Sequence, residues 1–475
     1  MSKLLFIRPE SDKRFALNGP PLELLELAGY LGKAGHDITL LDFLNNPNEK
    51  IERKTLQDID LVLVAYYSIN RVWANKIIQA IHLIAPNIRI VAGTIFNNDS
   101  QTTTMWRHIL DTIPGIDICT IGECEHTMLE LANGKPLEEI EGIAYRKDGK
   151  ILKNKDRKPE KNIDNFGAPA WELINFTKYP KGQGVHNGIN LSEHVSVPVR
   201  FSRGCPGSCK YCALWWVWQK WRTKTGEHMF KEIYNLYTTY GIRNFEFRDD
   251  CFGVNKKELQ IFCDKIVESG IKIAFLVSSR VDVLNNEEDL KKLKAAGCYR
   301  IAYGIETGSQ VILDEFNKEI DLESMRKTLK MVRRVGIDIH GLMIIGSPKE
   351  TVETINETID FLKDIELESI SAAGGIFLIP GTMYYYQAVE NGYIDDDFWL
   401  TTQAVKPDYS VFSKFRLFIF TKAVRNRKKI VSLRSEYNAK NIILFTGKEF
   451  AHRLGLRSFA EFVAMKVADF HRKKA

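Results

Sequence analysis

The sequence predicts a mixed α/β fold with two units built on parallel sheets, followed by a mainly helical C-terminal region. The first observation is length, because 475 residues exceed what one hydrophobic core usually supports. The second is a repeated pattern in which a helix ends at glycine and an apolar strand follows, at Gly35, Gly241, Gly270, Gly297 and Gly336. Glycine takes the left-handed conformation that caps a helix, and the apolar run indicates a strand buried on both faces. Such alternation predicts parallel sheets with right-handed crossovers.

The first unit spans residues 1–135 and is predicted to be a Rossmann-like, doubly wound domain. Its strands are expected at residues 3–8, 37–42, 61–66 and 88–93, with a weaker fifth strand at 116–121. Helices are expected at residues 22–34 and 72–84. Ligands of open parallel sheets bind beyond the carboxyl ends of the strands. The segments that follow these strands therefore form the expected ligand edge.

Residues 136–194 are predicted to be a connector, because they are rich in Lys, Asp, Asn, Gly and Pro and show only weak strand signals. Those signals lie at residues 142–146 and 150–152. The second α/β unit spans residues 195–395. Its strands are expected at residues 197–202, 244–247, 274–277, 300–303, 342–345 and 376–379. Residues 396–475 have helical patterning with few strand signals.

Composition indicates a globular protein of a reducing compartment. Hydrophobic residues make up 44% of the chain and charged residues 27%, which excludes a disordered chain. No apolar run is long enough to cross a bilayer, and the N-terminus lacks the pattern of a secretory signal. The eight cysteines are unevenly spaced and do not indicate a disulfide framework. The expected location is therefore the cytoplasm.

Charge is distributed unevenly along the chain. From Lys406 to the end there are 17 Lys or Arg and 5 Asp or Glu, a net charge of +12. The whole chain carries +6, so the preceding residues carry −6. The basic region is either a solvated helical face or a contact surface for anionic lipid, nucleic acid or an acidic partner protein.

The most informative motif is a group of three thiols with the spacing CxxxCxxC, formed by Cys205, Cys209 and Cys212. Thiolates select iron–sulfur clusters or zinc over magnesium, calcium or manganese. A structural zinc site has four ligands, and no fourth Cys or His follows nearby. Three thiolates could instead hold three corners of an iron–sulfur cube and leave the fourth iron open to a small molecule.

Polar or glycine-rich residues follow every predicted strand of the second unit. In a parallel barrel, catalytic groups collect at the carboxyl ends of the strands. These segments are the cysteine loop, Arg248-Asp249-Asp250, Ser278-Ser279-Arg280, residues 304–309, Gly346-Ser347-Pro348 and Pro380-Gly381-Thr382. Each segment alone is typical of an ordinary turn, but together the six predict one site at a common rim.

Together, the cysteine motif and these segments resemble those of the radical S-adenosylmethionine (SAM) superfamily. The cysteine spacing, with Tyr211 as the aromatic residue, matches the family motif CxxxCxΦC, and residues 304–309 match its GIE-[ST]-GS segment. The resemblance implies a partial (β/α)6 barrel of TIM type in which the three cysteines hold a 4Fe–4S cluster. The open iron would chelate SAM, and one electron would cleave SAM to a 5′-deoxyadenosyl radical that abstracts hydrogen from an unreactive carbon.

The resemblance also implies ten positions around SAM and assigns no further catalytic residue. Those expected at its ammonium group or ribose hydroxyls are Asp249, Asp250 and Glu306, and those expected at its carboxylate are Ser279 and Arg280. Those expected elsewhere on SAM are Tyr211, Ser309, Gly346, Pro348 and Leu378. For each residue, an ordinary hydrogen bond or ion pair at a strand end is the alternative interpretation.

The first unit resembles the cobalamin-binding domain that is fused to one large radical SAM class. The segments that carry this resemblance are Pro20-Pro21-Leu22-Glu23-Leu24, Gly122-Glu123-Cys124-Glu125, residues 142–146 and Pro169-Ala170-Trp171-Glu172. The cobalamin positions that it implies are Tyr66, Ser68, Gly93, Thr94, Gly122 and Glu123. Two features depart from the family: no Asp-x-His-x-x-Gly is present to ligate cobalt, and residues 92–96 read AGTIF where GG-x-[HP] is common. The domain therefore either binds cobalamin or has kept only the fold.

Half of the eight tryptophans follow the cysteine loop, at Trp215, Trp216, Trp218 and Trp221. They either line a pocket for an apolar substrate or a cobalamin face, or pack the first barrel helix. The remaining cysteines are too scattered for a second cluster and are interpreted as small buried hydrophobic residues.

The resulting hypothesis is a radical SAM enzyme that methylates an unactivated carbon with the help of cobalamin. The alternatives are radical cyclisation, carbon–carbon bond formation or rearrangement without methyl transfer, and, more remotely, a non-catalytic metal-binding protein. The expected partners are a small-molecule, lipid or peptide substrate and an electron donor of the flavodoxin or ferredoxin type. No nucleic-acid partner is expected. Peripheral membrane contact is a candidate role of the basic C-terminal region.

Overall fold

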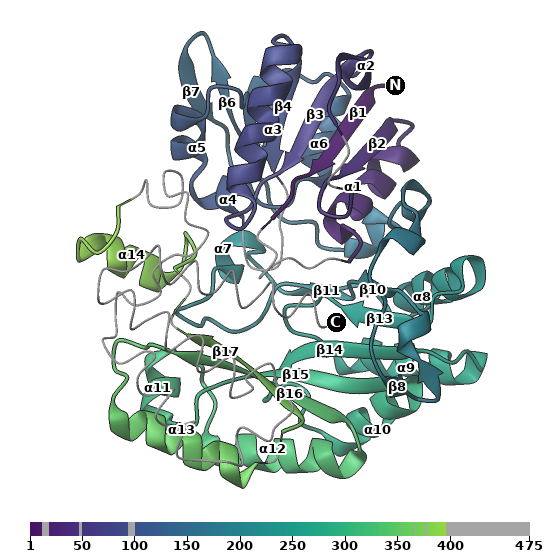
Figure 1. The fold of residues 1–475 in the computed structure, drawn as a ribbon, viewed down its shortest axis with the longest axis vertical. Coiled ribbons are helices and arrows are strands. Elements are labelled where there is room, and N and C mark those ends of the chain that lie inside the picture. Colours follow the sequence, from purple (N-terminus) through teal and green to yellow (C-terminus); the bar gives the residue numbers. More distant parts are fainter. Residues whose placement is uncertain are drawn as a thin grey trace, which may run out of the picture.

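The computed structural model describes residues 1–11, 19–46, 50–93, 100–365, 367–374, 376 and 378–395. The region 396–475, predicted to be mainly helical and basic, lies outside the described residues. Figure 1 shows two α/β units, one above the other, with the short helix α7 (Leu214–Val217) between them. The predicted α/β class is confirmed.

The first unit is a seven-stranded sheet with the order β2-β1-β3-β4-β5-β6-β7. Its strands are β1 (Lys3–Arg8), β2 (Asp37–Asp42), β3 (Leu61–Ala65), β4 (Arg89–Gly93), β5 (Ile118–Thr120), β6 (Ile143–Lys147) and β7 (Lys150–Lys153). The first five strands pair in parallel, and β6 and β7 are antiparallel. The segment expected as a connector thus contributes two strands to this sheet. The apolar signal is weak because β7, at the edge of the sheet, is largely exposed, and β6 ends in the polar residues Arg146 and Lys147.

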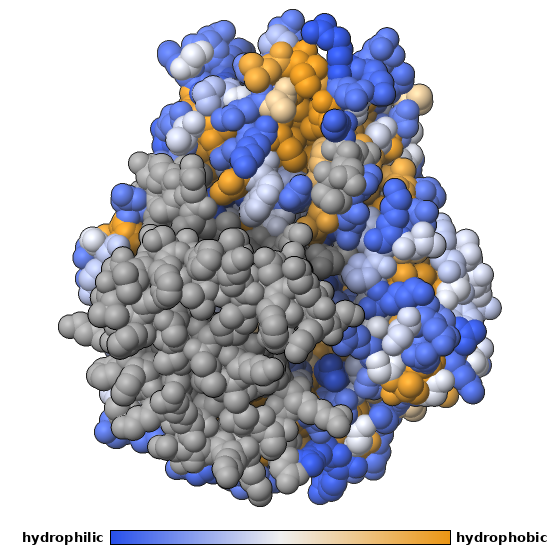
Figure 2. Space-filling model, viewed as in Figure 1, coloured by the Kyte–Doolittle hydropathy of each residue, from blue (hydrophilic) through white to orange (hydrophobic). Residues whose placement is uncertain are grey.

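Helices cover both faces of this sheet, because successive strand residues point to opposite sides. The helices are α1 (Leu22–Lys33), α2 (Arg53–Leu56), α3 (Arg71–Ile84), α4 (Gln101–Thr104), α5 (Trp106–Thr112) and α6 (Glu125–Ala132). Leu4 and Phe6 of β1 pack with α1 and α6, whereas Leu5 and Ile7 pack with α3 and α5. Figure 2 shows apolar side chains on the face over α3, among polar ones.

The second unit is a six-stranded, all-parallel sheet with the order β10-β13-β14-β15-β16-β17. Its strands are β10 (Ser196–Val199), β13 (Asn244–Phe247), β14 (Ala274–Arg280), β15 (Cys298–Glu306), β16 (Asp338–Ile345) and β17 (Ser369–Gly374). Its helices are α8 (Gly226–Tyr240), α9 (Lys256–Ser269), α10 (Glu287–Ala296), α11 (Gln310–Glu315), α12 (Leu322–Val335), α13 (Val352–Asp364) and α14 (Met383–Glu390).

The predicted helix–glycine–strand pattern organises this barrel. Helices α8, α9, α10 and α12 end at Gly241, Gly270, Gly297 and Gly336, all in the left-handed conformation with φ between 69° and 113°. A glycine adopts this conformation without the steric cost that a Cβ would bring. Each cap turns the chain at once into the next buried strand.

One strand of the barrel lies elsewhere than predicted. The sixth strand was expected at residues 376–379, but β17 is Ser369–Gly374 and pairs with β16 from His340 to Ile345. The prediction followed the apolar run, whereas the strand has a sequence of serine, alanine and glycine around one isoleucine. Ile376 and Leu378 instead join an apolar cluster that also contains strand residues of the first unit.

Shorter elements lie between the long helices and strands. These are two hairpins, β8 (Val185–His186) with β9 (Ile189–Asn190) and β11 (Ser202–Arg203) with β12 (Arg222–Thr223), and the 3-10 turns Leu137–Glu139, Ile163–Phe166, Trp171–Leu173, Phe176–Lys178 and Leu191–Glu193. In the described part of the chain, no helix combines the length and apolarity needed to cross a membrane.

Candidate functional site

The three thiols of the CxxxCxxC motif line one cavity of about 420 Å³ at the carboxyl ends of the barrel strands. They lie on residues 204–221, a loop closed at its base by the antiparallel pair β11 and β12. Cys209 is buried, and Cys205 and Cys212 are partly exposed. Within the described residues, no three His, Cys, Asp or Glu side chains converge as the ligands of a single metal ion would. The thiols are instead spread along the cavity wall.

Cys205 is prepared for the thiolate form that binds metal. The thiol of Cys251, at the carboxyl end of β13, hydrogen-bonds to Cys205 and lowers its pKa, and the backbone N–H of Gly207 donates to Cys205 Sγ at 3.4 Å. Arg280 adds a positive charge, with Nη1 3.7 Å from Cys209 Sγ. A Cβ at Gly207 would lie 2.4 Å from that same Nη1, so a larger residue here would require the arginine side chain to move.

A buried cation, Lys318, joins this wall of the cavity. Its Nζ lies 2.8 Å from Glu306 Oε1 and donates to the hydroxyl of Tyr211 at 3.3 Å. Tyr211 in turn donates to Glu306 at 2.9 Å. Burial disfavours the charged ammonium, but attraction by Glu306 and Cys209 outweighs it, and the pKa of Lys318 is raised. Arg280 is tied to the same segment, because its Nη2 donates to the Lys318 carbonyl at 2.7 Å.

Residues of this network lie on strained backbone. Glu306 has a φ of 63°, and the two neighbours of Lys318, Asn317 and Glu319, have φ values of 55° and 58°. Non-glycine residues rarely adopt this left-handed region, and such residues tend to collect at functional sites. Both partners of the Lys318–Glu306 ion pair are thus presented by strained backbone.

The two adjacent aspartates have different environments. Asp249 accepts hydrogen bonds from the backbone of Phe201 and Ser202, and burial raises its pKa to about 6. This side chain braces the strand that leads to the cysteine loop and does not line the cavity. Asp250 does line it and accepts from the Gly204 N–H at 3.0 Å. Burial raises the pKa of Asp250 to about 7.

The remaining residues predicted to contact SAM divide in the same way. Ser279 lines the cavity, although its hydroxyl donates to the Phe252 carbonyl at 2.8 Å. Ser309, Gly346, Pro348 and Leu378 are not among the described residues that line it. The segment after Glu306 instead packs on α13, where a Cβ at Gly308 would lie 2.4 Å from the Phe361 Cβ. Gly346 turns the chain toward Glu350, which accepts its N–H at 3.0 Å. Leu378 is fully buried in the apolar cluster described above.

Apolar side chains complete the cavity, including Leu214 of α7, Leu342 and Ile344 of β16, Ile376 and Ile379. The tryptophans beside the cysteine loop have different surroundings. The rings of Trp215 and Trp216 lie 4.4 Å apart, and both are partly exposed. Trp218 is buried, with the guanidinium groups of Arg200 and Arg203 over its ring.

The carboxyl edge of the first sheet gathers most of the positions predicted for cobalamin. Tyr66 is fully buried and donates to Asn75 Oδ1 at 3.0 Å. Ser68 is also buried, and Gly122 donates its N–H to Thr103 Oγ1 at 2.9 Å. Glu123 has a different partner set, because its carboxylate pairs with two arginines of the second unit. Thr94 lies outside the described residues.

Several buried polar groups at this edge have no hydrogen-bond partner among the described residues. Within the part of the chain that the structure describes, neither amide atom of Gln101 has a hydrogen-bond partner, and the hydroxyls of Thr102 and Thr120 also lack one. A Cβ at Gly93 would lie 2.1 Å from Thr120 Oγ1, so the end of β4 has room only for glycine. Buried polar groups are normally satisfied. This edge therefore fits a ligand rich in amide or phosphate groups, such as cobalamin.

Two residues of the site were not predicted from the sequence. Lys318 follows the short helix α11 rather than a strand, so no rule about strand ends selects it. Cys251 follows β13 but was assigned to the scattered, buried cysteines. A cysteine directly after Asp249 and Asp250 at the rim was the available signal for Cys251.

Two family models match the chain. The model of the Radical SAM superfamily matches residues 199–362, and that of the B12 binding domain matches residues 13–132. An uncharacterized methyltransferase of Pyrococcus horikoshii is 30% identical over 421 residues, which cover 85% of this chain and 87% of that protein. An anaerobic magnesium-protoporphyrin IX monomethyl ester cyclase of Rubrivivax gelatinosus is 27% identical over 378 residues, or 76% of this chain. The match spans 66% of that cyclase, slightly under two thirds of its length.

A similar arrangement occurs in a solved structure. The radical SAM methyltransferase TsrM of Kitasatospora setae, with tryptophan and a SAM analogue bound, matches with a TM-score of 0.66 and 17% sequence identity. The match covers 82% of this chain and 76% of that one. Another structure of that enzyme contains cobalamin and a 4Fe–4S cluster. At this identity the likeness concerns the fold, a parallel sheet followed by a barrel.

Proposed function

The chain belongs to the radical SAM superfamily, in the class that carries an N-terminal B12 binding domain, and from this premise we propose that it catalyses cobalamin-dependent methylation of an unactivated carbon. One observation carries the proposal. Three thiols and two buried cations line the barrel cavity, and α7 lies between the two units. The neighbouring unit contributes a sheet edge at which buried polar groups have no hydrogen-bond partner within the described part of the chain. Each unit thus offers the groups that its own cofactor requires.

The barrel residues would hold the cluster and SAM. Cys205, Cys209 and Cys212 supply the three soft ligands of a 4Fe–4S cluster. Arg280 and Lys318 are buried cations suited to the SAM carboxylate, and charged hydrogen bonds of this kind are the stronger ones. Asp250 is the acidic residue of the cavity that is best suited to the SAM ammonium group. The apolar part of the wall would exclude water from the reacting carbon.

Gln101, Thr102 and Thr120 would hold amide or phosphate groups of cobalamin at the first sheet. Cobalamin, when bound, supplies the methyl group to a carbon from which the cleaved SAM has removed hydrogen. The net reaction replaces one carbon-bound hydrogen by methyl. It consumes two SAM and two electrons from an external donor, and yields 5′-deoxyadenosine, methionine and S-adenosylhomocysteine beside the methylated product.

A second candidate is radical cyclisation, which the cyclase of Rubrivivax gelatinosus favours as a relative of similar sequence. In that case SAM cleavage would proceed without incorporation of a methyl group. The two functions share the cluster and the cleavage of SAM, and they differ in the fate of the substrate radical, which takes a methyl group in one and forms a bond within the substrate in the other.

The partners follow from this chemistry. We propose a small-molecule, lipid or peptide substrate and a one-electron donor of the flavodoxin or ferredoxin type, with no nucleic-acid partner. We propose a cytoplasmic location, because the eight cysteines are unevenly spaced and do not indicate a disulfide framework. Membrane contact through residues 396–475 remains a proposal, as do the domain boundaries 1–135, 136–194 and 195–395.

The test uses full-length protein reconstituted anaerobically with iron, sulfide and hydroxocobalamin. After gel filtration we expect retained cobalamin in the absorption spectrum and, with SAM and a reductant, 5′-deoxyadenosine. SAM carrying a labelled methyl group should transfer that label to a small-molecule, lipid or peptide acceptor from a cell extract. Protein that retains cobalamin but releases 5′-deoxyadenosine without label transfer would favour the cyclase. Failure to retain cobalamin would contradict the methylation proposal.

A further inference from the structure

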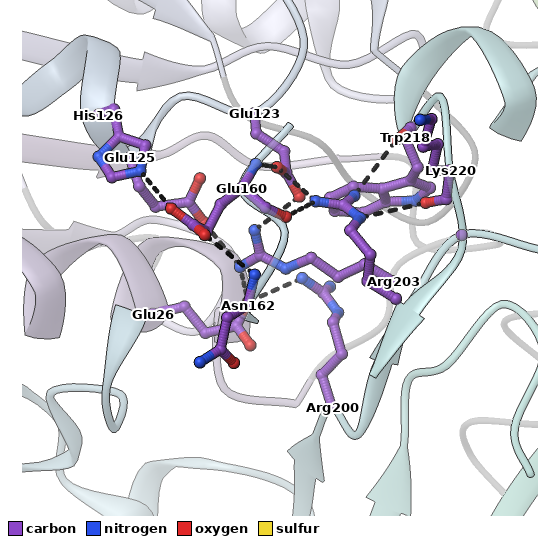
Figure 3. A network of polar contacts seen from close by, with 12 residues as sticks. Glu26, Glu123, Glu125, His126, Glu160, Asn162, Arg200, Arg203, Trp218 and Lys220 are labelled. Carbon is purple, nitrogen blue, oxygen red and sulfur yellow. Dashed lines mark hydrogen bonds and ion pairs between the residues drawn. The ribbon is translucent and has the colours of Figure 1, made fainter. Parts of the chain in front are cut away.

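Arg203 stands two residues before the first cluster cysteine, yet its side chain belongs to the contact between the two units. The guanidinium is 5% exposed and reaches three carboxylates. The separations are 2.6 Å to Glu125, 3.2 Å to Glu123 and 3.3 Å to Glu26. All three glutamates come from the first unit, on helices α1 and α6 and in the turn after β5. Figure 3 shows Arg203 beside these carboxylates and Arg200, of the same β10–β11 segment, next to Glu26.

A second arginine holds the other end of the cysteine loop. Arg222 of β12 stands opposite Arg203 of β11, and its Nη1 lies 2.7 Å from Glu123. Its Nη2 donates to the Trp218 carbonyl at 3.2 Å. The loop of residues 204–221, with all three cysteines and α7, is therefore gripped at both ends by one glutamate of the first unit.

The charged groups around these ion pairs are balanced in number and shielded from water. The interface ion cluster contains four carboxylates and four cations, all with side chains between 2% and 8% exposed: Glu26, Glu123, Glu125, Glu232, Arg200, Arg203, Arg222 and Lys224. A void of about 10 Å³ beside Arg203 has room for about one water molecule. The rings of Phe166 and Trp218 flank the guanidinium at 4.7 Å and 5.3 Å.

Such a cluster resists relative motion of the units. Separation of a buried ion pair leaves a charge that neither water nor another partner can satisfy, and this is strongly unfavourable. A shift of the first unit by the length of one hydrogen bond would break several of these pairs together. The cluster also adjoins both candidate sites, because Arg203 precedes Cys205 and Glu123 follows the sheet edge that carries Thr120.

We propose that Arg203 is a positioning residue that sets the separation between the cobalamin edge and the SAM cavity by holding the cysteine loop against the first unit. This inference rests on the proposed function, since it presumes that both cofactors bind. It assigns to the ion cluster a role in the alignment of two reaction centres, beyond its contribution to stability.

The test compares Arg203→Met and Arg203→Lys with a matched control, Arg334→Met, which removes an exposed pair with Glu287 on the outer helices. The first measurement is amide hydrogen exchange across residues 204–221 in cluster-loaded, full-length protein. We expect Arg203→Met to speed exchange about tenfold and the control to leave it unchanged. Arg203→Lys keeps the positive charge but loses the planar guanidinium that donates to several carboxylates. It should therefore speed exchange by a smaller factor. If Arg203→Met does not fold, Arg203→Lys is the variant that is compared with the control.

The second measurement is the magnetic interaction between the reduced cluster and cob(II)alamin in the EPR spectrum, with iron and cobalamin contents determined in parallel. We expect equal contents and a weakened interaction in the Arg203 variants. Wild-type exchange and wild-type interaction in Arg203→Met would overturn the inference. Faster exchange with an unchanged interaction would also overturn it, because the arginine would then steady the loop without setting the separation. If wild-type protein retains no cobalamin, the proposed function fails, and the exchange experiment alone decides whether Arg203 holds the loop.

Discussion

The ammonium Nζ of Lys318 lies 2.8 Å from Oε1 of Glu306, in the wall of the cavity that three cysteines also line. The pair joins two segments of backbone in the left-handed region and places a cation beside Cys209. This arrangement makes Lys318 a candidate for direct contact with the SAM carboxylate.

Replacement of Lys318 by methionine should weaken SAM binding about 10- to 100-fold, because hydrogen bonds to charged groups contribute about 1.5–3 kcal/mol. Iron content should not change, since no thiol is lost. Equilibrium dialysis of cluster-loaded protein with SAM measures the effect. Lys327→Met, which removes an exposed pair with Glu323, is the control. Wild-type affinity in Lys318→Met would remove this residue from the SAM site.

Loss of any one cluster thiol should abolish SAM cleavage. We expect the iron content per chain to fall well below the roughly four atoms of an intact cluster in each of the variants Cys205→Ala, Cys209→Ala and Cys212→Ala. Iron analysis and the yield of 5′-deoxyadenosine after anaerobic reconstitution give the two readings. The matched control is Cys263→Ala, because this thiol is buried in the barrel core. An intact cluster in any of the three variants would contradict the assignment of the ligands.

Replacement of Gln101 by leucine should have opposite effects on stability and on cobalamin. Both amide atoms of this buried side chain lack partners among the described residues. Leucine removes the cost of an unsatisfied buried group, so the cofactor-free protein should gain about 1 kcal/mol in free energy of unfolding. Cobalamin affinity should fall, because a ligand contact is lost. Denaturant unfolding and titration with hydroxocobalamin test the two effects, with the exposed Gln79→Leu as control. A gain in stability with unchanged affinity would show that Gln101 does not face the cofactor.

Glu26 should make the interface sensitive to acid. Burial favours the neutral acid, but Arg200, Arg203 and Lys224 outweigh this effect and hold the pKa of Glu26 below its ordinary value of 4.5. A carboxyl group with a lowered pKa in the folded state stabilises the fold above that ordinary value. This stabilisation is lost as the pH falls from 4.5 through the lower pKa of the folded state.

We therefore expect Glu26→Gln to be less stable than wild type at neutral pH and to lose less stability on acidification. Urea unfolding at a series of pH values between about 7 and 3 measures the difference. The exposed Glu323→Gln should follow the wild-type curve. Parallel curves for wild type and Glu26→Gln would refute the link between this carboxylate and acid stability.

The sequence was informative wherever one local pattern determines a structure. Apolar runs after glycine caps predicted β13 and β14, and the cysteine spacing predicted three thiols on one cavity. The position of β17 was predicted wrongly because its serine, alanine and glycine residues form no apolar run. The strand was instead expected at the more hydrophobic residues that follow. Pairing with β16 determines that strand, and pairing is a property of the whole barrel.

Contacts between segments that are distant in the sequence could not be predicted either. Glu123 was predicted at cobalamin because its segment, Gly122-Glu123-Cys124-Glu125, resembles one of the cobalamin-binding domain. Its arginine partners lie 80 and 99 residues further along the chain, and no local spacing indicates them. Lys318 likewise acquires its role from the strained turn that brings it under Glu306. In both cases the neighbours of the side chain are set by the packing of separate elements.

The interface ion cluster has a consequence for attempts to divide this protein into modules. A barrel expressed without the first unit would retain Arg200, Arg203 and Arg222 but lose Glu26, Glu123 and Glu125, their carboxylate partners. Three cations would then surround the base of the loop that must receive the iron. The two units can therefore be recognised separately by sequence, but they form a single unit of assembly, and cluster insertion is expected to require the whole chain.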